Sequence, residues 1–236
     1  MTDLPTLPSR LRHLPRRDFL MLAGGAAAAA VAATWGLSQV VHAQRKKPAG
    51  PAEVSVEELM KAGPLPDLVI GKADAPITIV EYASMTCGHC ASFHNKVLPA
   101  LKEKYIDTGK ARLIMREFPL DNLAAAASMV ARCAGGEKSF PLISVLFAKQ
   151  DDWAFIKGDP RPELFKLAKQ AGFTQESFDK CLADQKLLDE ITAVRTRGAD
   201  VFGVNATPTF FINGKKLTAG PTLEEFEKAF APILKS

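Results

Sequence analysis

The sequence predicts an α/β fold in which a strand–helix–strand unit and a C-terminal hairpin with a final helix enclose a helical insertion. Three observations predict it. Short runs rich in β-branched residues flank an amphipathic segment early in the chain, about 85 residues of helical spacing follow, and strand character then resumes. With 47% hydrophobic and 24% charged residues among 236, the composition is that of a globular protein with one good-sized core.

The first 43 residues have the layout of a secretory signal peptide. Four arginines lie within the first 18 residues, an uncharged alanine-rich stretch runs from Phe19 to Leu37, and Val41-His42-Ala43 supplies a cleavage site. The segment Arg16-Arg17-Asp18-Phe19-Leu20 resembles a twin-arginine export signal. An uncleaved anchor is the alternative, because 19 apolar residues nearly span a bilayer. In both cases the remaining chain faces an oxidising space.

Residues 44–66 are rich in lysine, proline, glycine and alanine, and we expect a tether there with a helical turn or two near Val54–Met60. The folded domain is expected over residues 67–236. Outside the first 43 residues the chain carries 26 lysines and arginines against 24 aspartates and glutamates. This balance gives no signal for nucleic-acid binding.

Two strands and a helix are expected at the start of the domain. Leu68–Gly71 and Ile77–Tyr82 are β-branched runs, and the second is continuous enough for a strand buried on both faces. From Cys87 to about Tyr105 the apolar residues recur with helical spacing, and Pro99 should kink this helix. Arg112–Phe118 then predicts a strand parallel to the second one, joined by a right-handed crossover.

The second half of the domain is expected to be a helical insertion, over about residues 119–203, followed by a hairpin and a helix. Thr209–Ile212 and Lys215–Thr218 flank Asn213-Gly214, which is typical of a type I′ hairpin turn. Thr222 followed by Glu225 has the spacing of a capping box, so a last helix should begin there.

The chemistry of the chain is expected at Cys87-Gly88-His89-Cys90, where a strand gives way to a helix. The unpaired amides and the dipole of a helix N-terminus stabilise an anion, so Cys87 should ionise well below the pKa of about 8.5 of a free cysteine. A protonated His89 would add positive charge near the same sulfur. We therefore expect Cys87 to attack disulfides and Cys90 to resolve the mixed disulfide, with a redox-active bond between the two.

Other interpretations of the Cys87–Cys90 pair remain open. A zinc site would need four ligands, and the other cysteines are single and far along the chain. A purely structural bridge would close a very short loop at a position where it is easily reduced. A carrier of a soft ion such as Cu(I) could use Cys87, Cys90 and His89, with Met85 as a further ligand.

The chain resembles the DsbA-like family of bacterial periplasmic thiol:disulfide oxidoreductases, in the thioredoxin superfamily, over about residues 67–236. Two segments carry the resemblance, Val80–Cys90 and Gly203–Phe210. It implies a thioredoxin-like fold with a helical insertion, and no cofactor or metal. It also implies a periplasmic protein that forms disulfide bonds in unfolded exported proteins and is reoxidised by a quinone-linked membrane partner. With no N-terminal dimerisation domain in the sequence, a monomer is expected.

The same resemblance assigns further site residues. Pro208 should follow a cis peptide bond, and Thr207 should touch the active-site sulfur and the substrate strand. Glu81 matches a buried acid that helps to move protons, although a charged residue in an apolar strand can also mark a sheet edge. The dipeptide Gly88-His89 is the one that protein disulfide isomerase uses, so an isomerase or a reductase is the alternative to an oxidase.

Three remaining residues complete the expectations. Cys133 and Cys181 lie in helical patterns of the insertion, and in an oxidising compartment we expect them to form a structural disulfide, with two buried free thiols as the alternative. Some members of the resembling family carry an extra bridge in this region. His94 is expected on the polar, solvated side of the first helix.

Overall fold

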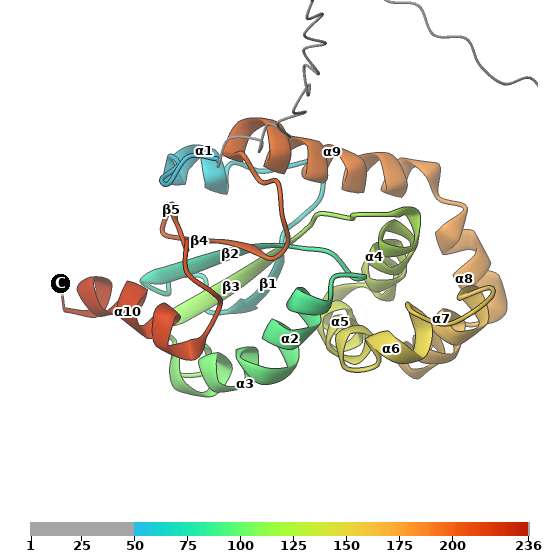
Figure 1. Cartoon of the computed structure of the whole chain (residues 1–236). Coiled ribbons are helices and arrows are strands. Elements are labelled where there is room, and N and C mark those ends of the chain that lie inside the picture. The colour runs from blue at the N-terminus through green and yellow to red at the C-terminus, as the bar shows by residue number, and fades with distance from the viewer. Residues whose placement is uncertain (1–49, 236) are drawn as a thin grey trace, which may run out of the picture. The chain divides into compact units, whose positions relative to one another are not determined.

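The computed structural model describes residues 50–235, so the expected signal peptide and the first residues of the expected tether lie outside the described range. Figure 1 shows the course of the chain. In order, the elements are α1 (Val56–Met60), β1 (Leu68–Gly71), β2 (Ile77–Ala83), α2 (Gly88–Lys96), α3 (Leu98–Leu101), a π-helical turn η1 (Lys102–Ile106), β3 (Ala111–Glu117), α4 (Asn122–Ala134), η2 (Gly136–Lys138), α5 (Ser139–Ala148), α6 (Gln150–Trp153), α7 (Arg161–Ala168), η3 (Lys169–Ala171), α8 (Gln175–Leu182), α9 (Gln185–Phe202), β4 (Thr209–Ile212), β5 (Lys215–Lys216) and α10 (Leu223–Leu234).

A five-stranded mixed sheet with the order β1-β3-β2-β4-β5 lies at the centre. Strand β2 pairs in parallel with β3, from Ile77 opposite Ala111 to Ala83 opposite Glu117, and antiparallel with β4. The expected strand–helix–strand unit is therefore confirmed. Because β2 has a neighbour on each side, all of its residues except Thr78 are buried.

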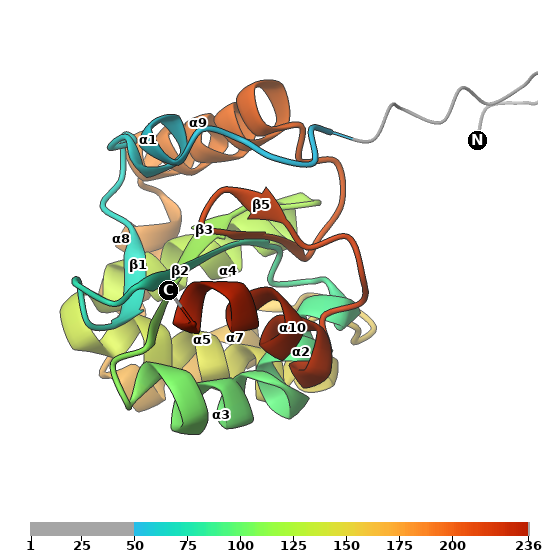
Figure 2. The same cartoon turned by 90° about the vertical axis from the view of Figure 1, so that its left-hand side faces the viewer.

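Helices cover both faces of the sheet, as Figure 2 shows in side view. Helices α2, α3 and α10 lie on one face, where Phe93 and Phe226 pack with Ile79. Helices α1 and α9 lie on the other face, where Phe202 packs with Tyr82. Successive residues of β2 point to opposite faces, so one strand supplies both cores.

The expected kink at Pro99 appears as a break in the first helix. Helix α2 ends at Lys96, Val97 has a φ of −110°, and α3 then begins at Leu98 with Pro99 in its first turn. Proline has no backbone N–H and its ring crowds the preceding turn, so the hydrogen-bond ladder cannot run through this position unchanged. The break leaves α2 as a separate short helix.

The hairpin and the last helix follow their sequence signals. Asn213 and Gly214 both have positive φ, 45° and 85°, as the predicted type I′ turn requires. The Asn213 side chain accepts a 2.7 Å hydrogen bond from the Thr78 amide, which fixes the turn against β2. Thr222 caps α10 by accepting a hydrogen bond from the amide of Glu225.

The insertion between β3 and β4 contains the helices α4 to α9 and has a core of its own. Trp153 is fully buried at its centre and donates a hydrogen bond to the Leu146 carbonyl. The predicted pairing of Cys133 with Cys181 is present and joins α4 to α8, with 6.1 Å between the two Cα atoms. Cys90 belongs to the same hydrophobic cluster, so the insertion packs directly against the redox pair.

Residues 50–66 are not a free linker, contrary to the expectation of a tether over 44–66. The Val54 amide donates to the Gly214 carbonyl, and the Lys216 amide donates to the Ala52 carbonyl, so this segment extends the sheet edge at β5. Leu59 of α1 is only 2% exposed. Leu59, Val54 and Met60 of this short segment pack against the sheet, which the proline-rich composition did not indicate.

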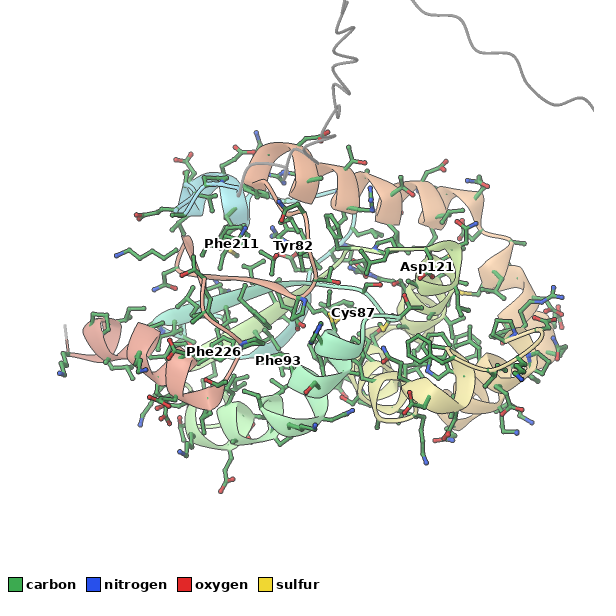
Figure 3. All side chains as sticks on the ribbon, viewed as in Figure 1. Tyr82, Cys87, Phe93, Asp121, Phe211 and Phe226 are labelled. Atoms are coloured by element: carbon green, nitrogen blue, oxygen red, sulfur yellow. A yellow bond between two sulfur atoms is a disulfide. The ribbon has the colours of Figure 1, made fainter. Side chains whose placement is uncertain are left out.

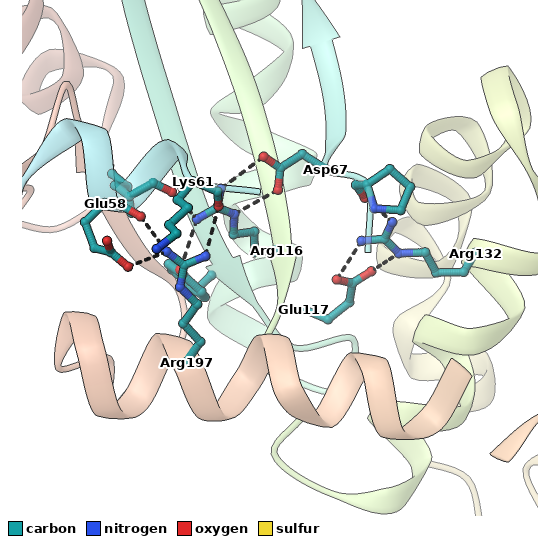
Figure 4. A network of polar contacts seen from close by, with 10 residues as sticks. Glu58, Lys61, Asp67, Arg116, Glu117, Arg132 and Arg197 are labelled. Carbon is teal, nitrogen blue, oxygen red and sulfur yellow. Dashed lines mark hydrogen bonds and ion pairs between the residues drawn. The ribbon is translucent and has the colours of Figure 1, made fainter. Parts of the chain in front are cut away.

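Three arginines hold this N-terminal segment to the domain (Figure 4). Arg116 makes a bidentate pair with Asp67 and also donates to the Leu59 carbonyl. Arg132 pairs with Glu117 and donates to the Pro66 carbonyl, while Arg197 pairs with Glu58. The Arg116 side chain is 7% exposed and that of Asp67 is 29% exposed, so these bonds are largely shielded from water.

Replacing Arg116 by methionine should therefore destabilise the domain. The substitution keeps most of the buried volume but leaves Asp67 and the Leu59 carbonyl without their donor, which we expect to lower the free energy of unfolding by about 3 kcal/mol. Urea titration of both proteins measures it. The matched control is Arg161→Ala, which removes an exposed pair with Asp159 and should leave stability unchanged within error. Equal effects of the two substitutions would contradict this account.

Candidate active site

Cys87 is the N-cap residue of α2, as the sequence predicts. Its backbone is extended, with φ −85° and ψ 116°, and its amide donates to the Ser84 carbonyl in the turn that follows β2. The sulfur therefore lies at the free amides of the first helical turn. Cys87 keeps 9% exposure, whereas Cys90 has none. Figure 3 shows Cys87 where α2 meets the insertion.

The pKa values of the two cysteines are shifted in opposite directions. The pKa of Cys87 is lowered to about 5, mainly because the Cys90 thiol donates a hydrogen bond to it. Burial opposes this shift, and the Thr207 side chain and the amides of Cys90 and His89 add to it. The pKa of Cys90 is raised, first by burial, then by its bond to Cys87 and by the charge of Glu81. Cys87 is thus the sulfur that is ionised near neutral pH, and Cys90 keeps its proton.

The residue His89 is exposed on the first turn of α2 and acts on Cys87 through its backbone amide. The added effect of its imidazole charge stays a prediction.

The loop before β4 faces the reactive sulfur. The peptide bond between Thr207 and Pro208 is cis, as the resemblance implies. The Cys87 sulfur lies 3.2 Å from the Thr207 carbonyl oxygen, which accepts a hydrogen bond from the thiol form. The Thr209 hydroxyl donates to the Ala206 carbonyl at 2.7 Å and braces the loop. Residues that are 120 positions apart in sequence therefore form one site.

Gln150 is a site residue that sequence reasoning missed. It begins α6 in the insertion, is 5% exposed, and donates to the carbonyl oxygens of Met85 at 2.8 Å and Cys87 at 3.2 Å. The Gln150 side chain thereby fixes the backbone of residues 85–87, which we call the redox turn, from the side of the insertion. A lone glutamine in a helical block carries no sequence signal for this role.

A second contact ties the redox turn to the insertion. The Thr86 hydroxyl donates a 2.7 Å hydrogen bond to Asp121, whose other oxygen caps α4 through the amide of Ala124. The same carboxylate thus orders the start of α4 and the residue next to Cys87.

Glu81 is completely buried on the central strand β2, so the alternative of a sheet edge is wrong. Its Oε2 lies 2.9 Å from Nε2 of His94. The expectation that His94 is solvated is therefore wrong as well. Position 94 lies one helical turn after Cys90 and faces the sheet, where the ring stacks on Phe147 with 4.2 Å between ring centroids.

The residues proposed for a soft-metal carrier do not converge in the described part of the chain. Met85 is buried in the core of the insertion, while His89 is exposed. Across residues 50–235, no three side chains of His, Cys, Asp or Glu are grouped so that they could hold a metal ion.

Comparisons with known proteins identify the fold and the family. The family model described as Thioredoxin matches residues 65–231. A protein of Rickettsia bellii named as a protein-disulfide oxidoreductase is 38% identical over 151 residues, which are 63% of this chain and 57% of that protein. This chain therefore spans little more than half the length of the curated relatives it matches first.

Solved structures similar to this one include the following two. The crystal structure of Wolbachia pipientis alpha-DsbA1 matches with a TM-score of 0.69 and 34% identity, covering 77% of this chain and 96% of that one. BdbD from Bacillus subtilis matches with a TM-score of 0.67 over 80% of this chain and 100% of that one, and at 20% identity it shows the shared fold alone. From the family match and from the Wolbachia structure it follows that the chain belongs to the thioredoxin family and, within it, to the DsbA-like thiol:disulfide oxidoreductases.

Proposed function

We propose that this protein forms disulfide bonds in exported proteins by passing on the bond between Cys87 and Cys90. The observation that carries the proposal is the pKa of about 5 for Cys87 beside a Cys90 that keeps its proton. A stabilised thiolate favours the reduced state of the pair. A pair whose reduced state is favoured is a strong oxidant, because it takes up electrons readily.

The transfer runs through a mixed disulfide. A substrate thiolate attacks the Cys87 sulfur of the Cys87–Cys90 bond, and Cys90 leaves with the electron pair. A second substrate thiolate then attacks the substrate sulfur of the mixed disulfide, and Cys87 leaves as a thiolate. The substrate loses two electrons and two protons. The protein holds the electrons as a Cys87 thiolate and a Cys90 thiol, so one proton goes to Cys90 and the other to the solvent. Thr207 and Pro208 would bind the substrate strand beside the sulfur.

The setting of this reaction is proposed from the sequence. Residues 1–43 would direct export to the periplasm through a twin-arginine signal, and they lie outside the described residues. Among residues 50–235, no helix has the length and apolar character needed to span a membrane. Unfolded exported proteins with cysteines would be the substrates of the monomer, and a quinone-linked membrane protein would reoxidise the pair.

An isomerase or a reductase is the second candidate, favoured by the dipeptide Gly88-His89. The reduction potential distinguishes the three roles, since reference values are about −120 mV for a strong oxidase, about −180 mV for protein disulfide isomerase and about −270 mV for thioredoxin. Equilibration with glutathione, read by alkylation and mass, should give a value nearer to that of the oxidase. A value near that of thioredoxin would remove the oxidase assignment.

Cys87→Ser should abolish exchange, whereas the double variant Cys133→Ala/Cys181→Ala should keep the potential and lose stability.

The low pKa of Cys87 predicts how stability depends on pH. Its thiol has an ordinary value of 9.0 and about 5 when folded, so the folded reduced protein gains stability over the unfolded one as pH rises from about 5 to 9, and loses it as pH falls. The oxidised protein has no such thiol and should lack this gain. Denaturant titrations of both redox forms at several pH values measure the difference, and parallel curves would count against a stabilised thiolate.

The hydrogen bond from Cys90 can be tested by two matched substitutions. In Cys90→Ala the largest cause of the low pKa is removed, so Cys87 should ionise clearly above pH 5, whereas Cys90→Ser keeps a donor and should shift it less. Thiolate absorbance against pH gives both values. An identical pKa in the two variants would show that the Cys90 side chain is not the main cause.

Removing the Gln150 amide should weaken the redox turn. We expect alkylation of Cys87 to slow in Gln150→Ala, because two buried carbonyls lose their donor, and to slow further in Gln150→Glu, whose carboxylate would face those carbonyls. The exposed Gln170→Ala in the same insertion is the control and should react as the unaltered protein does. Unchanged rates in both Gln150 variants would rule out this positioning role.

A further inference from the structure

The loop before β4, residues 203–208, is the part of the site to which the substrate strand is proposed to bind. In the described part of the chain these residues belong to no helix or strand. The loop nevertheless holds the Thr207 carbonyl oxygen 3.2 Å from the Cys87 sulfur. Such placement matters, because a displacement of about 1 Å can slow a reaction about 100-fold. The segment that supports this loop from its other side therefore bears on how a substrate meets the sulfur.

Residues 50–60, which we call the strap, contact the loop where it begins. Gly50 lies against Gly203, the residue that caps the end of α9 and starts the loop (Figure 2). The two backbones are in direct contact. A Cβ built on Gly50 would lie 2.3 Å from the Gly203 carbonyl oxygen, and one built on Gly203 would lie 2.6 Å from the Gly50 Cα. Only glycine allows so close an approach of two backbones.

The strap is also bonded to the turn that follows β4. The Val54 amide donates to the Gly214 carbonyl at 2.9 Å, and the Lys216 amide donates to the Ala52 carbonyl at 2.8 Å. The loop and β4 together run from Gly203 to this turn. The strap is therefore fixed to both ends of the segment that carries the substrate-binding loop.

Apolar packing joins the strap to the loop between these two points. Val204 of the loop is 2% exposed and belongs to the same hydrophobic cluster as Leu59 of the strap. Val54 packs against that cluster as well. The loop thus shares a core with the strap while it presents Thr207 to the Cys87 sulfur.

We propose that the strap positions the loop before β4 for the binding of polypeptide substrates. This inference rests on the proposed function and deepens it. A substrate strand binds more tightly to a loop that is already in place, because a mobile loop would lose conformational freedom on binding. Gly50 and Val54 are positioning residues in this sense, since both act through the loop. The strap should therefore affect the choice of substrate more than the chemistry of the two sulfurs.

Two reductants of the oxidised protein separate these effects. In each case two thiols of the reductant become a disulfide, and Cys87 and Cys90 take up the two electrons. A cysteine-containing peptide would lie along the loop, whereas dithiothreitol has only to reach the Cys87 sulfur. Because the pKa of Cys87 depends mainly on the Cys90 thiol, a displaced loop should leave the reaction with dithiothreitol nearly unchanged.

Gly50→Ala is the main variant, because its Cβ would push the strap away from Gly203. The probe is a synthetic peptide with two cysteines, and its single-turnover oxidation is followed by alkylation and mass at increasing peptide concentration. We expect the peptide concentration at half-maximal rate to rise about tenfold, while the limiting rate and the rate with dithiothreitol stay within about twofold.

Gly63→Ala is the matched control. It is the same substitution outside the strap, and the nearest atom to its new Cβ would be the Leu65 carbonyl oxygen at 3.9 Å. Both substitutions restrict the unfolded chain in the same way. The control should therefore react with peptide and with dithiothreitol as the unaltered protein does.

Val54→Pro tests the other end of the strap and carries the test if Gly50→Ala does not fold. Proline has no amide hydrogen, so the bond to the Gly214 carbonyl is lost. We expect the same selective loss with the peptide. Urea titration of each variant accompanies the rates, because a strap with a purely structural role would change stability and leave the ratio of the two rates unchanged.

Two results would overturn the positioning role. One is an unchanged half-saturating peptide concentration in the folded variants. The other is an equal slowing with peptide and with dithiothreitol, which would indicate a general effect on the redox pair. Failure of the proposed function would look different, because the reduction potential of the unaltered protein would then lie near that of thioredoxin, whatever the strap variants do.

Discussion

The hydrogen bond from the Cys90 thiol to the Cys87 sulfur is the interaction on which the site depends. It is strongest while Cys87 is ionised and Cys90 is not, and the structure favours both conditions. The free amides at the start of α2 stabilise the anion, and complete burial keeps the proton on Cys90. Two cysteines three residues apart thus become chemically unequal, which a flexible pair in water would not be. This inequality favours the reduced state of the pair, which is what the proposed oxidase function requires.

The fold supplies this inequality through its topology. A parallel strand pair with a crossover helix brings the end of β2 to the start of α2, so Cys87 meets helical amides without any side-chain cap. The antiparallel strand β4 then brings the cis bond before Pro208 to the same edge. The insertion packs against the pair as well. Its Gln150 side chain binds the carbonyls of the redox turn, and its hydrophobic core covers Cys90. The β2–α2 junction, the loop before β4 and the insertion therefore each restrict the position or the ionisation of the two sulfurs.

The sequence alone predicts the features that depend on residues close together in the chain. Three of these features are set by residues within a few positions of one another, and the structure has all three. They are the helix start at Cys87, the turn at Asn213-Gly214 and the helix start at Thr222. The features it could not give depend on contacts between distant segments. Gln150 reaches the turn from 63 to 65 positions away, and Leu59 is buried by strands that no local pattern connects with it. His94 lies between these cases. Its four-residue spacing from Cys90 is a usable signal, but a polar residue near Lys96 is also typical of the solvated face of a helix.

The burial of Cys90 belongs to the same constraint. It keeps the proton on Cys90, and the hydrogen bond that this proton makes is the largest cause of the low pKa of Cys87. The charge of Glu81 acts in the same direction, because it raises the pKa of Cys90. A buried carboxylate is costly, and the imidazole of His94, 2.9 Å away, reduces that cost with a hydrogen bond. The polar pair on β2 and α2 therefore supports the asymmetry that makes the two cysteines unequal.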